Sequence, residues 1–188
     1  MHDLGRNEDR LRGTYEFPFE FHHIDSSHPR YVMSYHWHVE CEIMRVLQGT
    51  LTVTLDEKSF TAKAGDVIFV NSGVLHSGIP QDCIYQCIVF DMNMFLKFNS
   101  VCTEYMQKIS HQELLIYHHF TEKQPDIQRA VNSLFDSFWQ RKPGYELVVF
   151  GQFYHFFGLV FGNHYYLESL RKTRRDYKRI VQLKQVVE

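Results

Sequence analysis

His36, His38 and Glu42 carry side chains that bind divalent metal ions, and they are spaced as H-x-H-x3-E. Successive side chains on a strand point to opposite faces, so the two histidines share a face. Glu42 has the same parity and joins them if the strand continues without a bulge. A fourth ligand is then expected from elsewhere, and His76, which follows a short apolar strand and a turn, is the best candidate. The pattern predicts a metal site built from these four residues.

The same four residues have a second interpretation, in which they are hydrogen-bonded inside a barrel or line a pocket for an organic ligand. Burying a carboxylate beside imidazoles is unfavourable without compensation, and a divalent cation removes that penalty. Zinc, nickel, iron and manganese are all compatible with imidazole and carboxylate ligands. Both interpretations remain open from the residues alone.

Three other polar residues are candidates for contact with a ligand. Glu40 shares the parity of the metal-binding pattern, so it either orients a histidine or stands at the rim. Arg45 and Gln86 interrupt apolar strands and are expected to bind a carboxylate or a sugar hydroxyl, unless they lie exposed on an edge strand. No nucleophile stands beside a paired base, and no glycine loop suits a phosphate, so no catalytic residue is predicted.

The chain around these residues is expected to form one domain with appended helices. Its 188 residues and hydrophobic fraction of 44% are ordinary for a soluble domain. Its net charge of −2 predicts no overall electrostatic attraction to nucleic acid. The four cysteines form no CxxC pair and the N-terminus has no apolar signal core, so we expect free thiols in a reducing cytoplasm.

The first half of the chain has the pattern of an antiparallel β-structure. Residues 1–14 are charged and aperiodic, which predicts a flexible arm. Residues 15–91 contain many short apolar or alternating runs separated by turns, which is typical of a closed or sandwiched antiparallel fold. Gly49 is expected to make a turn between two of these strands.

Helical spacing replaces the strand pattern after Asp91. Apolar residues recur at that spacing between Pro125 and Pro143, which suit a helix start and stop. Residues 92–120 predict short helices with an exposed linker near residues 110–112.

Residues 146–161 are apolar in nearly every direction. A membrane span is one interpretation, but Gln152 and His155 interrupt the run and it is shorter than a span needs. We predict a helix covered on one side by the sheet and on the other by a second copy of the chain. The alternative is that the helices of residues 92–142 cover it within one chain.

The two histidine-bearing segments resemble the two signature motifs of the cupin superfamily. The first matches at both histidines, the glutamate and Gly49, and departs at Arg30, where some members carry glycine. The second matches at two glycines and the histidine, and departs at Asn71 and Pro80, where proline and asparagine are usual. The run of residues 36–78 is similar, more specifically, to the sensor domain of AraC-family transcription regulators.

The resemblance implies an α+β fold: an antiparallel cupin β-barrel (a double-stranded β-helix, or jelly roll) at residues 15–91 and a helical dimerisation region at 92–170. A basic linker helix at 171–188 would lead to a helix-turn-helix DNA-binding domain absent from this chain. The implied partners are a small-molecule effector and a second copy of the chain, with no membrane and no catalysis. The alternative is a small metal-dependent cupin enzyme, an oxygenase or isomerase, that uses the same four residues.

Overall fold

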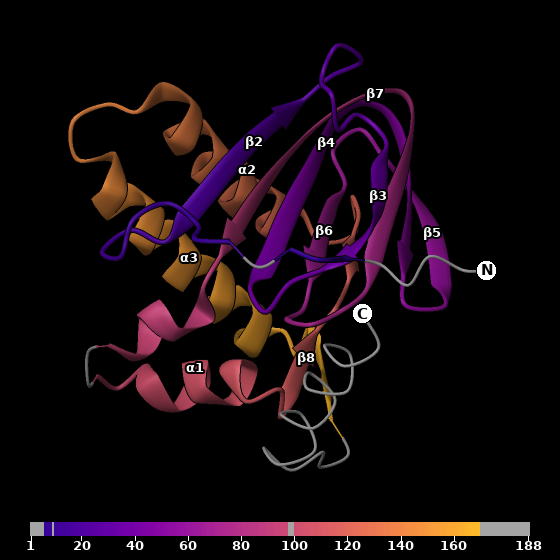
Figure 1. The fold of residues 1–188 in the computed structure, drawn as a ribbon. Helices are drawn as coiled ribbons and strands as arrows, with labels where there is room; N and C mark the ends of the chain where they lie inside the picture. The colour runs from indigo at the N-terminus through magenta and orange to yellow at the C-terminus, as the bar shows by residue number, and fades with distance from the viewer. Residues whose placement is uncertain (1–5, 9, 98–99, 170–188) are drawn as a thin grey trace.

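The computed structural model describes residues 6–8, 10–97 and 100–169 (Figure 1). The strands are β1 (Arg6–Asn7), β2 (Phe19–Ile24), β3 (Met33–Trp37), β4 (Cys41–Leu55), β5 (Lys58–Lys63), β6 (Val67–Val70), β7 (His76–Phe90), β8 (Leu114–Ile116), β9 (His119–Phe120) and β10 (Tyr166–Glu168). The helices are the 3-10 helix η1 (Met92–Leu96), α1 (Thr103–Ser110), α2 (Pro125–Gln140) and α3 (Tyr145–Gly162).

Two long strands, β4 and β7, form the framework of the β-structure. They pair antiparallel along their whole lengths, from Cys41 opposite Phe90 to Leu55 opposite His76. One half of this ribbon carries β2 and β6 at its sides, and the other half carries β3 and β5. The predicted α+β class with an antiparallel jelly-roll barrel is confirmed. The segment predicted to be helical also supplies strands, because β9 pairs with β6 and β8 with β10.

Gly49 does not end a strand, contrary to the turn predicted there. β4 runs through it, and the pairing with β7 shifts register on both sides of Gln48. Gly49 has φ +66°, the left-handed conformation that glycine adopts without strain. The bulge reverses which parity faces inward, because Met44 before it and Leu51 after it both belong to the same buried cluster.

The sheet separates two apolar clusters. The smaller one fills the barrel interior and includes Met44, Leu51 and Tyr85. The larger one lies between the other face of the sheet and the helices, and includes Ile43 of β4 and Ile88 of β7. Figure 1 shows α2 and α3 running beside the sheet on that face. Neighbouring residues of one strand therefore belong to different compartments.

Helix α2 begins where the sequence predicts. Pro125 occupies its first turn, and the helix ends at Gln140, followed by Arg141, whose φ is +46°. Its apolar stripe, including Val131 and Leu134, is fully buried against the larger cluster. This is the expected behaviour of an amphipathic helix with one polar face.

Helix α3 is covered differently from the prediction. Phe153, Phe156 and Phe157 are at most 1% exposed within the single chain, so a second subunit is not needed to cover them. Rings from β2, β7 and η1, including those of Phe19 and Phe95, pack against them. No helix among the described residues has the length and hydropathy needed to cross a membrane.

The flexible arm predicted for residues 1–14 is wrong for the part that the structure describes. Arg6 and Asn7 pair in parallel with His36 and Trp37 of β3. Arg12 is only 2% exposed, because its guanidinium lies among carboxylates. Residues 1–5 and 9, and the predicted basic linker helix at 171–188, lie outside the described residues.

Candidate metal centre and ligand cavity

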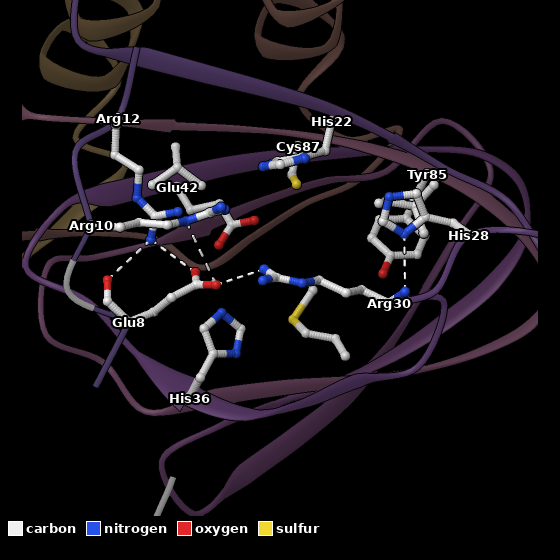
Figure 2. A pocket seen from close by; sticks show the side chains of 13 residues that line it. Glu8, Arg10, Arg12, His22, His28, Arg30, His36, Glu42, Tyr85 and Cys87 are labelled. Atoms are coloured by element: carbon white, nitrogen blue, oxygen red, sulfur yellow. Dashed lines mark hydrogen bonds and ion pairs between the residues drawn. The ribbon is translucent and has the colours of Figure 1, made fainter. Parts of the chain in front are cut away.

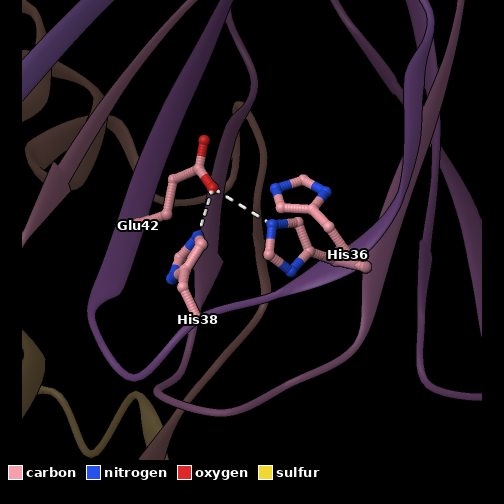
Figure 3. A group of neighbouring side chains, drawn as sticks. His36, His38 and Glu42 are labelled. Carbon is pink, nitrogen blue, oxygen red and sulfur yellow. Dashed lines mark hydrogen bonds and ion pairs between the residues drawn. The ribbon is translucent and has the colours of Figure 1, made fainter. Parts of the chain in front are cut away.

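His36, His38, Glu42 and His76 offer one ligand atom each, and these atoms all lie within 4.8 Å of one another (Figure 3). His36 and His76 come from paired positions on β3 and β7, and their ring centroids are 4.1 Å apart. His38 lies in the connection after β3, and Glu42 is the second residue of β4. The motif is therefore not one continuous strand: a turn lets β3 and β4 both aim side chains at the same point.

Each of the three imidazoles has its Nδ1 atom within hydrogen-bond distance of a main-chain oxygen two residues away. The oxygens belong to Ser34 (2.9 Å from His36), Glu40 (3.0 Å from His38) and Val74 (2.8 Å from His76). Since a carbonyl only accepts, Nδ1 must carry the proton, and in a neutral ring Nε2 is then left with its lone pair. This is the tautomer that binds a metal ion through Nε2.

Glu42 is where these lone pairs converge. One of its oxygens, Oε2, lies 3.3 Å from His38 Nε2 and 3.2 Å from His76 Nε2. The second contact is too poorly aligned for a hydrogen bond, and the buried His76 Nε2 has no partner among the described residues. Unprotonated nitrogens facing a carboxylate repel it unless a proton or a cation lies between them. A divalent cation satisfies every atom of this group, so the residues fit a metal ion.

The electrostatics of the group favour charges that suit a metal. Burial, together with the neighbouring His76, lowers the pKa of His36 to about 4. Burial alone would raise the pKa of Glu42, but the contacts with His38 and His76 outweigh burial and hold it well below 4.5. At neutral pH the site therefore presents a neutral His36 imidazole and an ionised Glu42 carboxylate, the forms that coordinate metals.

We expect the metal-free domain to lose stability as the pH falls from about 6.5 towards 4, because unfolded His36 binds a proton there and folded His36 does not. Stability rises with pH wherever the unfolded state binds more protons, so the loss is on the acid side. Urea unfolding at pH 7.5 and pH 5 in the presence of a chelator measures it. His36→Asn should reduce the difference between the two pH values, and an equal difference in the variant would contradict the assignment.

A cavity of about 60 Å³ opens beside the four-residue group, inside the barrel (Figure 2). Its polar lining comprises Glu8, Arg10, Arg12, His22, His28, Arg30, His36 and Glu42, and Cys87 also lines it. Its apolar lining comprises Ile24, Met33, Tyr85 and Val89. Two residues of the four-residue group, His36 and Glu42, thus line a space that holds only a few water-sized atoms.

Arg45 and Gln86, predicted to contact a ligand, lie away from this cavity. Arg45 donates to Gln86 Oε1 at 2.8 Å and to Asp136 Oδ1 of α2 at 2.8 Å. Its guanidinium carbon lies 5.0 Å from the centre of the Phe135 ring. Arg45 is three positions from Glu42, so it faces the helices when Glu42 faces the interior. Arg45 attaches α2 to the sheet with support from Gln86, and both residues are buried rather than exposed on an edge strand.

Glu40 contributes to the site through its main chain. Its carbonyl oxygen accepts the hydrogen bond from His38 Nδ1, which fixes that ring. Its side chain is 13% exposed and lies near buried Arg12, with 3.9 Å between Arg12 Nε and Glu40 Oε1. It does not line the cavity described above.

The contribution of Glu8, Arg10 and Arg12 was not predicted from the sequence. Glu8, Arg10 and Arg12 close one side of the cavity, although they belong to a segment without apolar periodicity. The signal that could have found them is the alternation of acidic and basic residues, which allows a segment to dock through ion pairs rather than through apolar burial.

The fold and the four-residue group together define the class of this domain: an antiparallel jelly-roll barrel with a cluster of histidines and a carboxylate inside. The family model described as the AraC-like ligand binding domain matches residues 18–156. The chain belongs to this family.

A search of curated proteins gives a shorter match. The uncharacterized HTH-type transcriptional regulator YdeC from Bacillus subtilis (strain 168) is 34% identical over 56 residues, which are 28% of this chain and 19% of that protein. The match thus spans about a fifth of the relative's length.

Among solved structures, oxalate decarboxylase from Bacillus subtilis is 25% identical over 32% of this chain and 18% of that chain, with a TM-score of 0.29. The conserved SPY1581 protein of unknown function from Streptococcus pyogenes is 15% identical over 39% of this chain and 62% of that chain, with a TM-score of 0.34. Scores this low carry no information about function.

Proposed function

We propose that this chain is the ligand-sensing and dimerisation domain of an AraC-family transcription regulator. In this proposal a small-molecule effector binds in the barrel, and the domain passes its state to a helix-turn-helix DNA-binding domain outside this chain, in the cytoplasm. The match to the AraC-like ligand binding domain over residues 18–156 carries the proposal. The curated relative, described as an HTH-type transcriptional regulator, supports it.

We further propose that His36, His38, Glu42 and His76 hold a divalent metal ion. The supporting observation is the set of Nε2 lone pairs directed at one carboxylate oxygen, which only a proton or cation can reconcile. Zinc, nickel, iron and manganese suit this donor set. A bound ion would act as a Lewis acid for an effector oxygen, while the three main-chain carbonyls keep the imidazoles in the binding tautomer.

We expect His76→Ala to weaken metal binding at least ~100-fold, because loss of a ligand should exceed the effect of losing a group that only orients one. Calorimetric titration with zinc and with manganese measures the affinity, and elemental analysis measures occupancy. The protein should be purified without an affinity tag, since tag purification can load nickel. His164→Ala is the matched control, because His164 is exposed and outside the group. Equal affinities in both variants would contradict the site.

The alternative function is a small metal-dependent cupin enzyme, an oxygenase or isomerase. The observation in its favour is that His36 and Glu42 line the cavity, so a metal ion there would have a neighbouring space for substrate. The family match favours the sensor. The two functions separate experimentally, because a sensor releases its ligand unchanged after binding, whereas an enzyme releases product.

The proposed dimer contact lies on the outer face of α3. Leu147 is 80% exposed, Val148 45% and Tyr154 38%, although the aromatic residues on the opposite face are buried within the chain. A second copy of the chain would cover these apolar side chains. Sedimentation of a Leu147→Glu variant tests this contact.

A further inference from the structure

Glu8 lies in the cavity mouth and is held by three arginines (Figure 2). Arg12 Nη2 donates to Glu8 Oε2 at 2.8 Å, and Arg30 Nη1 donates to Glu8 Oε1 at 2.6 Å. Arg10 Nε lies 3.8 Å from Glu8 Oε1. Both oxygens of one carboxylate are therefore engaged by guanidinium groups from two different parts of the chain. We call Arg10, Arg12 and Arg30 the arginine cradle.

The cradle is a built feature of the cavity wall rather than a chance surface contact. The side chain of Arg12 is only 1% exposed, and Glu20 holds its Nη1 at 2.7 Å. Its buried Nε makes no hydrogen bond among the described residues, and the nearest carboxylate oxygen, Glu40 Oε1, is 3.9 Å away. A buried donor without a partner is unfavourable, and a ligand that supplies an acceptor relieves this.

The carboxylate of Glu8 behaves as a firmly bound anion. Burial alone would raise its pKa, but the hydrogen bond and charge of Arg12, together with Arg30 and Arg10, lower it to about 2. Glu8 belongs to the short segment that begins with β1, and its main-chain nitrogen donates to the Trp37 carbonyl at 2.9 Å. This places the carboxylate in the mouth, on the same side of the cavity as His36.

We propose that the arginine cradle is the subsite for the carboxylate group of a small organic acid, and that Glu8 occupies it as an internal substitute in the ligand-free chain. This deepens the proposed function and rests on it, since it names the chemical class of the effector. A ligand carboxylate takes the place of the Glu8 carboxylate, so the charge balance of the cradle is unchanged. Guanidinium groups suit this ligand because their paired N–H donors match the two oxygens.

The dimensions and lining of the cavity restrict the rest of the ligand. A volume of about 60 Å³ accommodates only a few non-hydrogen atoms while Glu8 is in place. Met33, Tyr85 and Val89 give the wall an apolar part, which favours a short hydrocarbon body over a polyhydroxylated one. His36 and Glu42 line the same cavity, so a carboxylic acid bound in the cradle would lie beside the candidate metal group.

The proposal requires that the ligand competes with Glu8. Glu8→Ala empties the cradle, and we expect it to bind acetate and propionate roughly tenfold or more tightly than the unmodified chain, because an internal competitor acts at a high effective concentration. Glu16→Ala is the matched control, since Glu16 is an exposed glutamate in the same region and outside the cradle. Acetamide, which is neutral and nearly the same shape as acetate, should show no gain. Titrations followed by NMR chemical shifts suit affinities in the millimolar range.

Two further variants keep the test decisive. Glu8→Gln retains the size of the side chain without its charge, so it gives the same comparison if Glu8→Ala folds poorly. Circular dichroism establishes folding, which should persist because Arg12 keeps its contact with Glu20. Adding Arg30→Ala to Glu8→Ala should remove most of the gain. Equal acetate affinity in Glu8→Ala, Glu16→Ala and the unmodified chain, or an equal gain for acetamide, would overturn the proposal.

A zinc titration of the same Glu8→Ala protein separates this inference from the proposed metal site. Zinc binding without any gain for acetate means that the cradle proposal fails and the metal site stands. A gain for acetate without zinc binding means that the cradle stands and the metal site fails.

Discussion

Phe153→Glu is expected to unfold the domain rather than release a folded monomer. Phe153 is fully buried, and its ring centroid lies 4.5 Å from that of Phe90 and 5.2 Å from that of Phe19. Truncating a buried phenylalanine costs about 3–5 kcal/mol in the free energy of unfolding. An unpaired carboxylate in that site adds a further penalty, so the total approaches the whole stability of a typical domain, about 5–15 kcal/mol. Far-UV circular dichroism with urea unfolding measures the loss.

Leu147→Glu on the same helix is the matched control. Leu147 is 80% exposed, so its replacement should change the free energy of unfolding by no more than ~0.5 kcal/mol in a monomer. If the outer face of α3 contacts a second copy of the chain, sedimentation should show this variant as a folded monomer and the unmodified chain as a dimer. A folded Phe153→Glu monomer would contradict the burial, and a monomeric unmodified chain at micromolar concentration would contradict the dimer.

The second large effect is expected at Gly49. Its φ is +66°, and a Cβ atom there would lie 2.2 Å from the Asp82 carbonyl oxygen and 2.5 Å from the Gln81 carbonyl oxygen. Both neighbours are main chain of β7, so the two central strands must separate to admit even a methyl group. We expect Gly49→Ala to cost at least ~3 kcal/mol in the free energy of unfolding, from left-handed strain of about 1–2 kcal/mol plus the steric clash.

Gly144→Ala isolates the steric part of that effect. Gly144 also has a positive φ, +81°, but a Cβ atom there would meet no other atom within 4 Å. Its replacement should therefore cost only the left-handed strain of about 1–2 kcal/mol. Urea unfolding of the two variants side by side gives the difference. If Gly144→Ala is as destabilising as Gly49→Ala, the clash with β7 is not the cause.

The sequence predicted most of the barrel because its signals are local. Alternation of apolar residues identifies a strand such as β5, and a short apolar run identifies β6, without knowledge of their partners. The bulge at Gly49 escaped prediction because a turn and a bulge both use a glycine with positive φ, and only the pairing with β7 distinguishes them. The contact of Arg45 with α2 was not predicted for the same reason, because it depends on which face of β4 packs against that helix.

The candidate metal group was identifiable from its residue types and spacing, although a turn rather than one continuous strand brings Glu42 to the histidines. The surroundings of the group were not identifiable. His36 and His76 are neighbours because β3 pairs with β7, and this pairing joins residues far apart in the chain. The burial of α3 was misjudged for a related reason, since rings from β2 and η1, such as those of Phe19 and Phe95, supply its cover. The docking of Glu8 depends on arginines at positions 12 and 30, which no periodic pattern relates.

The sheet has an inner face towards the cavity and an outer face towards the helices. Two consecutive residues of one strand therefore contact the two sides. Glu42 belongs to the metal group, and Ile43, the next residue, packs in the cluster shared with the helices. Cys87 and Ile88 on β7 repeat the arrangement. A peptide unit is rigid, so any rotation of β4 that reorients Glu42 also reorients Ile43. Binding of a ligand inside the barrel can therefore move residues that contact the helices directly, with no intermediate side chains.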